Sequence, residues 1–319
     1  MGYNLYINGT RTDTRDNKKI SSVVINNVIY SVEPLLTCTV SGLGSSSPSS
    51  VTFTNNTITN WTPEVVTKDN RSFVKFPTFY RKVNAVSSSQ ITSFSIANYK
   101  VDNDYQPYSC FVKEDGETVM DYVLVAVDFF STSSTIADGR TTAQSYGTGY
   151  QLYDWQIHKL FQDLAICKLG TIDTNNGSGI ASLLGINWGS TSTWIDGICS
   201  NASNDYWTFS YKPSKYVDSP TTSTDGYQVV NYERPTSNGD IQKLGYDTSN
   251  PFVNYTSAVV SNSSYNTYYC DSYGYASGSH PVICGIGNTQ VHRGVFHCDM
   301  SYNWSGSNGA RLCYRPISE

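Results

Sequence analysis

Short apolar stretches separated by polar turns make up most of this chain, which is the pattern of β-strands. Residues 73–83 and 91–101 alternate apolar and polar side chains and therefore predict two half-buried strands. Residues 122–130, YVLVAVDFF, form a nearly continuous apolar run, which predicts a central strand buried on both faces. After residue 177 the pattern predicts only short strands and long polar loops.

The segment from Asp154 to Leu169 has the periodicity of a helix. Its apolar side chains recur every three or four residues and fall on one helical face; they are Ile157, Leu160, Phe161, Leu164 and Cys167. Asp154 stands at the N-cap position, and Gly170 suits the left-handed residue that ends many helices. We expect Leu160, Phe161 and Leu164 to pack on the strand 122–127. Residues 139–150 leave room for no more than a turn or two of helix.

These patterns predict an α+β fold, mostly β and long loops, with one principal helix. The first 65 residues are short β-like pieces separated by polar turns, and residues 41–53 are a Gly/Ser/Pro-rich stretch typical of a loop or linker. We therefore expect two domains. A β-rich segment spans residues 1–65, and a larger domain spans residues 66–319.

The amino-acid composition argues against several classes of function. Charged residues are 15% of the chain, below the roughly 25% of an average soluble protein, and 25 tyrosines supply part of the polarity. The net charge of −5 and the lack of a basic stripe argue against nucleic-acid binding. We expect no membrane insertion, because no run of about 18 apolar residues occurs, and no signal peptide. Without such a signal, the eight cysteines are expected to be reduced and buried.

Residues 267–316 have the composition of a contact surface. Tyr, Trp, Asn, Ser, Gly and His crowd this segment, while Lys and Glu are nearly absent. Tyrosine and tryptophan offer large, rigid, amphipathic area, and Ser, Gly and Asn offer adaptable hydrogen bonding. The segment ends in a short apolar strand, residues 309–314, so it belongs to a folded domain.

Four segments, in this order, resemble a known family: residues 73–83 with a Pro-x-Phe-Tyr sequence, 105–129, 153–180 with a Trp-bearing helix, and 267–314. The family is the set of bacteriophage tail-fibre and receptor-binding proteins, found in many gut phages, whose C-type-lectin-like domain is related to the formylglycine-generating-enzyme fold. The resemblance implies a twisted β-structure with two helices on one side and long ligand-binding loops on the other. Residues 1–65 lie outside it and would serve virion attachment or oligomerisation.

The resemblance implies a structural protein of the virion, a tail fibre or tail tip, that is assembled in the host bacterial cytoplasm. It would bind a host-surface glycan or protein, contact other virion proteins and form a homo-oligomer, with a trimer favoured. Two alternatives stay open. One is a head-fibre or capsid-decoration protein of the same fold, and the other is a cell-surface polysaccharide hydrolase.

The candidate receptor-binding residues lie in the segments that join the strands of the last family block. They are Tyr273, Tyr275, Gln290, His292, Tyr302, Asn303 and Trp304. Aromatic and amide side chains displayed on loops are typical of binding sites. Tyr268 and Tyr269, by contrast, precede Cys270 in an expected strand, so one or both should be core. His297 is a further candidate, or an inward-facing strand residue.

Metal binding and catalysis are not expected. The spacing of His280, His292, His297 and Cys298 fits no standard zinc motif, and residues 106–108 do not match the calcium-binding sequences of C-type lectins.

An enzyme of the related fold would need a matched cysteine pair near the C-terminus, for which Cys298 and Cys313 are the nearest candidates. A glycosidase would need two carboxylates, and Asp271 and Asp299 are the pair nearest the loops. Neither pair has a supporting motif, so we expect no enzyme activity and no cofactor.

Overall fold

The computed structural model describes residues 35–174, 181–189, 191–201, 206–261, 267–286 and 293–316. It also gives the backbone of four short strands near the N-terminus: β1 (Leu5–Ile7), β2 (Thr10–Thr12), β3 (Ser22–Ile25) and β4 (Val28–Ser31). These four pair as two antiparallel ladders, β1 with β2 and β3 with β4.

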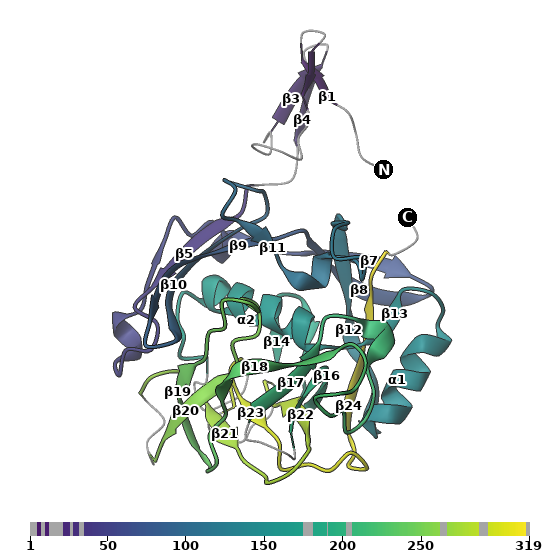
Figure 1. Cartoon of the computed structure of the whole chain (residues 1–319). Coiled ribbons are helices and arrows are strands. Elements are labelled where there is room, and N and C mark those ends of the chain that lie inside the picture. Colours follow the sequence, from purple (N-terminus) through teal and green to yellow (C-terminus); the bar gives the residue numbers. More distant parts are fainter. Residues whose placement is uncertain are drawn as a thin grey trace.

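Two main sheets form the body of the protein (Figure 1). The smaller is antiparallel, with the order β11–β9–β10–β5–β6. Its strands are β5 (Thr37–Ser41), β6 (Thr52–Thr54), β9 (Tyr80–Ser87), β10 (Gln90–Ala97) and β11 (Gln106–Pro107).

The larger sheet runs β20–β19–β21–β23–β22–β16–β24–β12–β8–β7, with β13, β17 and β18 attached beside this path. Its strands are β7 (Glu64–Lys68), β8 (Arg71–Pro77), β12 (Tyr122–Ser134), β13 (Tyr150–Leu152), β16 (Thr193–Ser200), β17 (Tyr206–Ser210), β18 (Tyr227–Glu233), β19 (Gly239–Leu244), β20 (Thr256–Val260), β21 (Ser272–Gly274), β22 (Pro281–Cys284), β23 (Cys298–Asp299) and β24 (Asn308–Tyr314). The C-terminal strand β24 pairs antiparallel with β12 and parallel with β16, so it joins strands β7, β8 and β12 to the strands that follow α2.

Short elements complete the described chain. Strands β14 (Ser182–Leu183) and β15 (Ile186–Asn187) pair with each other, and four single turns of 3-10 helix are η1 (Pro48–Ser50), η2 (Ile58–Asn60), η3 (Ser109–Phe111) and η4 (Pro213–Lys215). Within the described residues there are two α-helices, so the prediction of a mostly β fold is confirmed at that level.

Helix α2 (Trp155–Leu169) confirms the prediction for its segment. The Asp154 carboxylate accepts a hydrogen bond from the amide of Ile157 at 3.0 Å, and Gly170 ends the helix at φ 66°. The helix is buried on all sides from its first residue to Cys167, not on one face alone. It lies between the smaller sheet and the strands around β16 (Figure 1). Its nearest backbone neighbours are β16, η2 and η3, whereas Val123 and Val125 of β12 share its core cluster.

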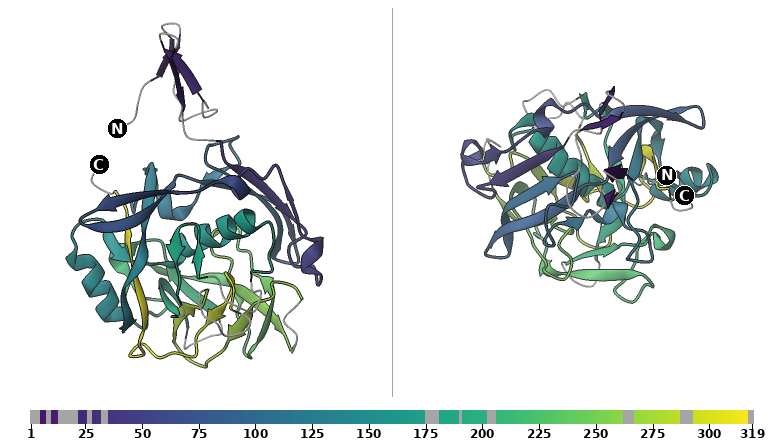
Figure 2. Two further views of the ribbon diagram at one scale, coloured as in Figure 1. Left: turned by 180° about the vertical axis from the view of Figure 1, so that it is seen from behind. Right: turned by 90° about the horizontal axis from the view of Figure 1, so that it is seen from above.

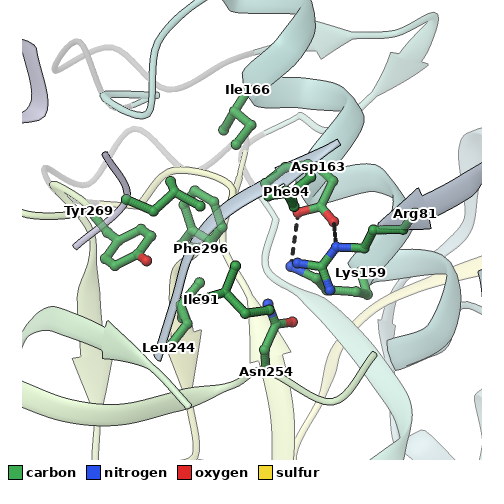
Figure 3. A pocket seen from close by; sticks show the side chains of 11 residues that line it. Arg81, Ile91, Phe94, Lys159, Asp163, Ile166, Leu244, Asn254, Tyr269 and Phe296 are labelled. Atoms are coloured by element: carbon green, nitrogen blue, oxygen red, sulfur yellow. Dashed lines mark hydrogen bonds and ion pairs between the residues drawn. The ribbon is translucent and has the colours of Figure 1, made fainter. Parts of the chain in front are cut away.

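Burial on every side is possible because the polar side chains of α2 find partners. The Asp163 carboxylate contacts Lys159 Nζ at 2.9 Å and Arg81 Nε at 3.2 Å, and it accepts the Tyr108 hydroxyl hydrogen at 2.7 Å. Figure 3 shows the two cations on this carboxylate, beside Phe94 and Asn254. The cavity there measures about 10 Å³, room for a single water molecule. This ionic cluster joins β9 of the smaller sheet to α2.

Helix α1 (Ile136–Ser145) fits the expectation for residues 139–150, of which residues 139–145 are helical, about two turns. The helix begins before this range, at Ile136, and the hydroxyl of its N-cap residue Thr135 accepts a hydrogen bond from the amide of Asp138 at 3.1 Å. Ile136 and Ala143 face the core. The prediction of one principal helix omitted α1, because its sequence IADGRTTAQS carries few apolar residues and follows a Ser/Thr-rich stretch.

The two helices pack on opposite faces of the β12–β24 pair. Val123, Val125 and Cys313 belong to the core cluster that holds α2, whereas Leu124 and Leu312 belong to a second cluster with the apolar residues of α1. Alternate residues of a strand point to opposite faces, so this pair of strands separates the two cores. The arrangement differs from the expectation of two helices on one side.

The predicted boundary at residue 65 does not coincide with the edge of the core. Apolar side chains before it are buried in the α2 cluster, among them Leu36, Cys38, Val40, Leu43, Val51 and Ile58. Strand β5 pairs with β10 over five residues, and Lys168 of α2 donates to the carbonyl oxygens of Thr59 and Trp61. Residues 36–61 therefore belong to the larger unit.

Candidate functional site

The C-terminal strands carry a cluster of loops at the lower edge of the molecule in Figure 1, below β21, β22 and β23. We use the name C-terminal loop surface for Tyr275, residues 277–280 and residues 301–307. Of the seven predicted binding residues, Tyr275, Tyr302, Asn303 and Trp304 lie on it. Gln290 and His292 lie outside the described residues.

Tyr273 is not exposed, which corrects its prediction as a binding residue. It lies in β21 with 2% of its surface exposed, and its hydroxyl donates a hydrogen bond to the Pro235 carbonyl oxygen at 2.9 Å. Its ring meets Trp207 edge-on, with centroids 6.4 Å apart. Tyr273 points into the core from the three-residue strand β21. It therefore packs beneath the C-terminal loop surface and is not part of it.

Tyr275, two residues later, is half-buried. The guanidinium of Arg234 lies 5.0 Å from the centre of its ring, a cation–π geometry, and Asn238 Oδ1 accepts the Tyr275 amide hydrogen at 2.7 Å. The ring is thus held in place from one side while part of it stays accessible. Rigid aromatic groups of this kind bind partners at low entropic cost.

Two loops meet at Trp304. Its indole Nε1 donates to the Ser279 carbonyl oxygen at 3.0 Å, and His280 Nδ1 lies 2.9 Å from the carbonyl oxygen of Tyr302. The Tyr302 ring also packs edge-on against Trp194 with centroids 6.4 Å apart. Tyr302 and Trp304 are half-buried, whereas Asn303 between them is exposed. Both aromatic side chains therefore have a structural role as well as an accessible face.

The platform beneath these loops is organised by Asp271. Its carboxylate accepts hydrogen bonds from the amides of Gly294 and of Phe296, the latter at 2.9 Å. Burial raises the pKa of Asp271 to about 8, and these two amides oppose that shift. At the other end of β21, the amide of Met300 donates to the Gly274 carbonyl oxygen at 3.0 Å. These bonds fix the position from which residues 301–307 leave the sheet.

Burial determines whether the other aromatic and histidine candidates belong to the core or to the surface. Tyr269 is buried in the core, and Tyr268 is half-buried against it. His297 is buried, with Nδ1 2.9 Å from the carbonyl oxygen of Ser272. Burial lowers the pKa of His297 to about 4, so the ring is neutral at pH 7. The inward-facing alternative for His297 is the one that the structure supports.

The residues considered for metal binding and catalysis are not arranged as a metal site or an accessible catalytic pair in the described part of the chain. Within the described ranges, no group of three or more His, Cys, Asp or Glu side chains is placed to hold a metal ion. Asp271 is fully buried on backbone amides, and Asp299 is buried and accepts the amide hydrogen of Ser301 at 2.8 Å. All eight cysteines, Cys298 and Cys313 among them, are buried free thiols.

Sequence reasoning missed one surface feature. An open groove of about 370 Å³ runs between the loop after β5 and the β9–β10 turn, where Gly44, Ser88 and Gln90 line it together with Lys243 of β19. Its lining is dispersed along the chain in serine- and glycine-rich turns, which carry no distinctive sequence signal. It lacks the fixed aromatic side chains of the C-terminal loop surface.

Comparison with known proteins adds no relative. No family model matches the chain, and no curated protein has a significantly similar sequence. Neither described helix is long and apolar enough to cross a membrane.

Proposed function

We propose that this chain is a structural protein of a bacteriophage virion, with a C-type-lectin-like receptor-binding domain. It attaches to a host-surface glycan or protein through the C-terminal loop surface. The single observation that carries the proposal is the joining of two loops by Trp304, Ser279, His280 and Tyr302, which leaves aromatic faces accessible on a rigid base. The chain acts by binding, without turnover.

The arrangement suits a weak, repeated contact. Half-buried aromatic rings can stack on sugar rings or fill shallow pockets of a protein, and the exposed amide of Asn303 can hydrogen-bond to hydroxyl groups. Single contacts of this size give modest affinity, and several copies on one particle multiply it. The pairing of β24 with β12 holds the C-terminal strand in the centre of the larger sheet and leaves residues 301–307 outside the sheet.

The capsid-decoration alternative uses the same surface for a different partner, such as a mucus glycan or another virion protein. Polysaccharide hydrolysis would require two accessible carboxylates, and Asp271 is committed to backbone amides. Binding is therefore the function that the described geometry favours.

The test is binding of the purified full chain to intact cells and to isolated surface polysaccharides from a panel of gut bacteria. We expect saturable binding to some strains or polysaccharides, with the polysaccharide recovered at its original length. Shortening of the polysaccharide would favour the hydrolase. Binding to mucin or virion proteins, together with no binding to any cell or polysaccharide, would favour the decoration protein.

A further inference from the structure

Strand β7 forms one outer edge of the larger sheet, beside β8 (Figure 1 and the view from behind in Figure 2). Its sequence is EVVTK, and among the described strands it pairs with β8 alone. Val65 is 56% exposed, the highest value among the exposed large hydrophobic residues of the described chain. An exposed strand edge that carries an apolar side chain is a template for pairing with another strand.

The hairpin geometry shows which backbone groups of β7 point outward. The turn residues Asp69 and Asn70 both have positive φ, 49° and 59°, so Lys68 and Arg71 close a two-residue hairpin. The closing pair is hydrogen-bonded, and such pairs recur at every second residue. The amides and carbonyls of Val65 and Thr67 therefore point away from β8, toward the free edge.

This edge is complementary to itself. If a second copy of β7 adds antiparallel with Val66 opposite Val66, the outward groups of Val65 face those of Thr67 of the copy. The same register places Glu64 opposite Lys68 at both ends. These ends are non-hydrogen-bonded pairs, in which side chains approach closely, so the opposite charges attract. One register thus satisfies hydrogen bonding and charge together.

We infer that two copies of this chain associate through β7 in a twofold-symmetric dimer, which joins their large sheets edge to edge, in place of the trimer that the family resemblance favours. The inference does not depend on the proposed receptor. It places the interface on β7, whereas the C-terminal loop surface lies at the opposite edge of Figure 1. Each dimer would then carry two C-terminal loop surfaces. Two linked binding surfaces bind a repeated receptor more tightly than one surface alone.

Charge exchange tests the register. In Glu64→Lys or Lys68→Glu, both end pairs become like-charged, so we expect dimerisation of the full chain to weaken roughly tenfold or more, measured by analytical ultracentrifugation. The double variant Glu64→Lys/Lys68→Glu restores opposite charges across the dimer, so it should dimerise more tightly than either single variant. It should stay below the original, because Glu64 also contacts Lys75 of its own copy at 3.3 Å and Lys68 lies 4.3 Å from the centre of the Tyr314 ring. An equimolar mixture of the two single variants should form heterodimers.

A second variant tests the strand pairing itself. Thr67→Pro removes an amide hydrogen that faces outward, so the hairpin with β8 keeps its bonds while the dimer loses two. We expect monomers with a nearly unchanged melting temperature. Monomeric original protein at all concentrations would overturn the inference. A trimer would also overturn it. So would a dimer whose affinity is unchanged by the charge substitutions and by Thr67→Pro.

Discussion

Helix α2 and the C-terminal loop surface use aromatic side chains in different ways. Trp155 at the start of α2 is fully buried and donates its indole hydrogen to the Ser210 carbonyl oxygen at 2.8 Å. Trp304 makes the same kind of bond to Ser279 at 3.0 Å, yet it is half-buried. The hydrogen bond fixes the ring in both places. The two residues differ in burial. The ring of Trp155 is fully buried in the core, whereas part of the Trp304 ring stays accessible to a binding partner.

The largest expected effect concerns β5 and β6, because the residues of this region cover α2. A shortened chain that starts at residue 66 loses β5, β6 and the six buried side chains described above. Each buried apolar side chain contributes about 1.5–3 kcal/mol, so the loss is comparable to the whole stability of a domain. We expect no cooperative thermal transition by calorimetry.

A chain that starts at residue 35 is the matched control, and it should melt cooperatively. A cooperative melt of the chain from residue 66, close to that of the full chain, would restore the boundary at residue 65. It would also remove the smaller sheet from the core of α2.

Within α2, two leucines offer a matched pair. Leu164 is fully buried, whereas Leu169 is 40% exposed. Leu164→Ala should lower the free energy of unfolding by about 2–5 kcal/mol through lost burial and the remaining cavity. Leu169→Ala should change it by less than about 1 kcal/mol. Chemical denaturation measures both values, and equal losses would contradict the packing described for the helix.

Acid should weaken both regions through buried neutral histidines. Burial lowers the pKa of His158 in α2 to about 3 and that of His297 near the loops to about 4, both from about 6.5. The stabilisation is complete above pH 6.5 and is lost as the pH falls toward these values, because the unfolded chain binds the proton more readily. Each histidine should cost about 2 kcal/mol between pH 6.5 and 5.

His297→Gln isolates the contribution of the loop region. Its free energy of unfolding, measured by denaturant at both pH values, should fall by about 2 kcal/mol less than that of the original protein. An unchanged pH dependence would show that the His297 ring is accessible to solvent.

The smallest expected contrast comes from removing one hydroxyl group at Tyr273, inside β21, or at Tyr275, directly after that strand. Tyr273→Phe loses the buried bond to Pro235 and should cost about 1 kcal/mol of stability. Tyr275→Phe should stay within about 0.5 kcal/mol. Thermal melts compare the two, and a larger loss at Tyr275 would reverse their assignment to core and surface.

Local signals predicted some of this structure, and long-range packing decided the rest. The cap at Asp154 and the left-handed Gly170 are set by neighbouring residues, so the ends of α2 are readable from sequence. Residues 41–53 resemble a linker in composition, yet Leu43 and Val51 are buried because strands distant in sequence cover them. The three-residue β21 is too short for a period, so the inward turn of Tyr273 had no sequence signal.

The proposed binding of a receptor by the C-terminal loop surface can be tested at Asn303, which is exposed between two fixed aromatic side chains. Asn303→Arg adds bulk and charge there without removing a core contact. Asn103→Arg makes the same change at an exposed residue near β11, at the opposite edge in Figure 1. On a strain or polysaccharide that the original chain binds, we predict that Asn303→Arg abolishes binding while Asn103→Arg preserves it, with both melting temperatures unchanged. Full binding by the folded Asn303→Arg variant would show that the receptor contacts another surface.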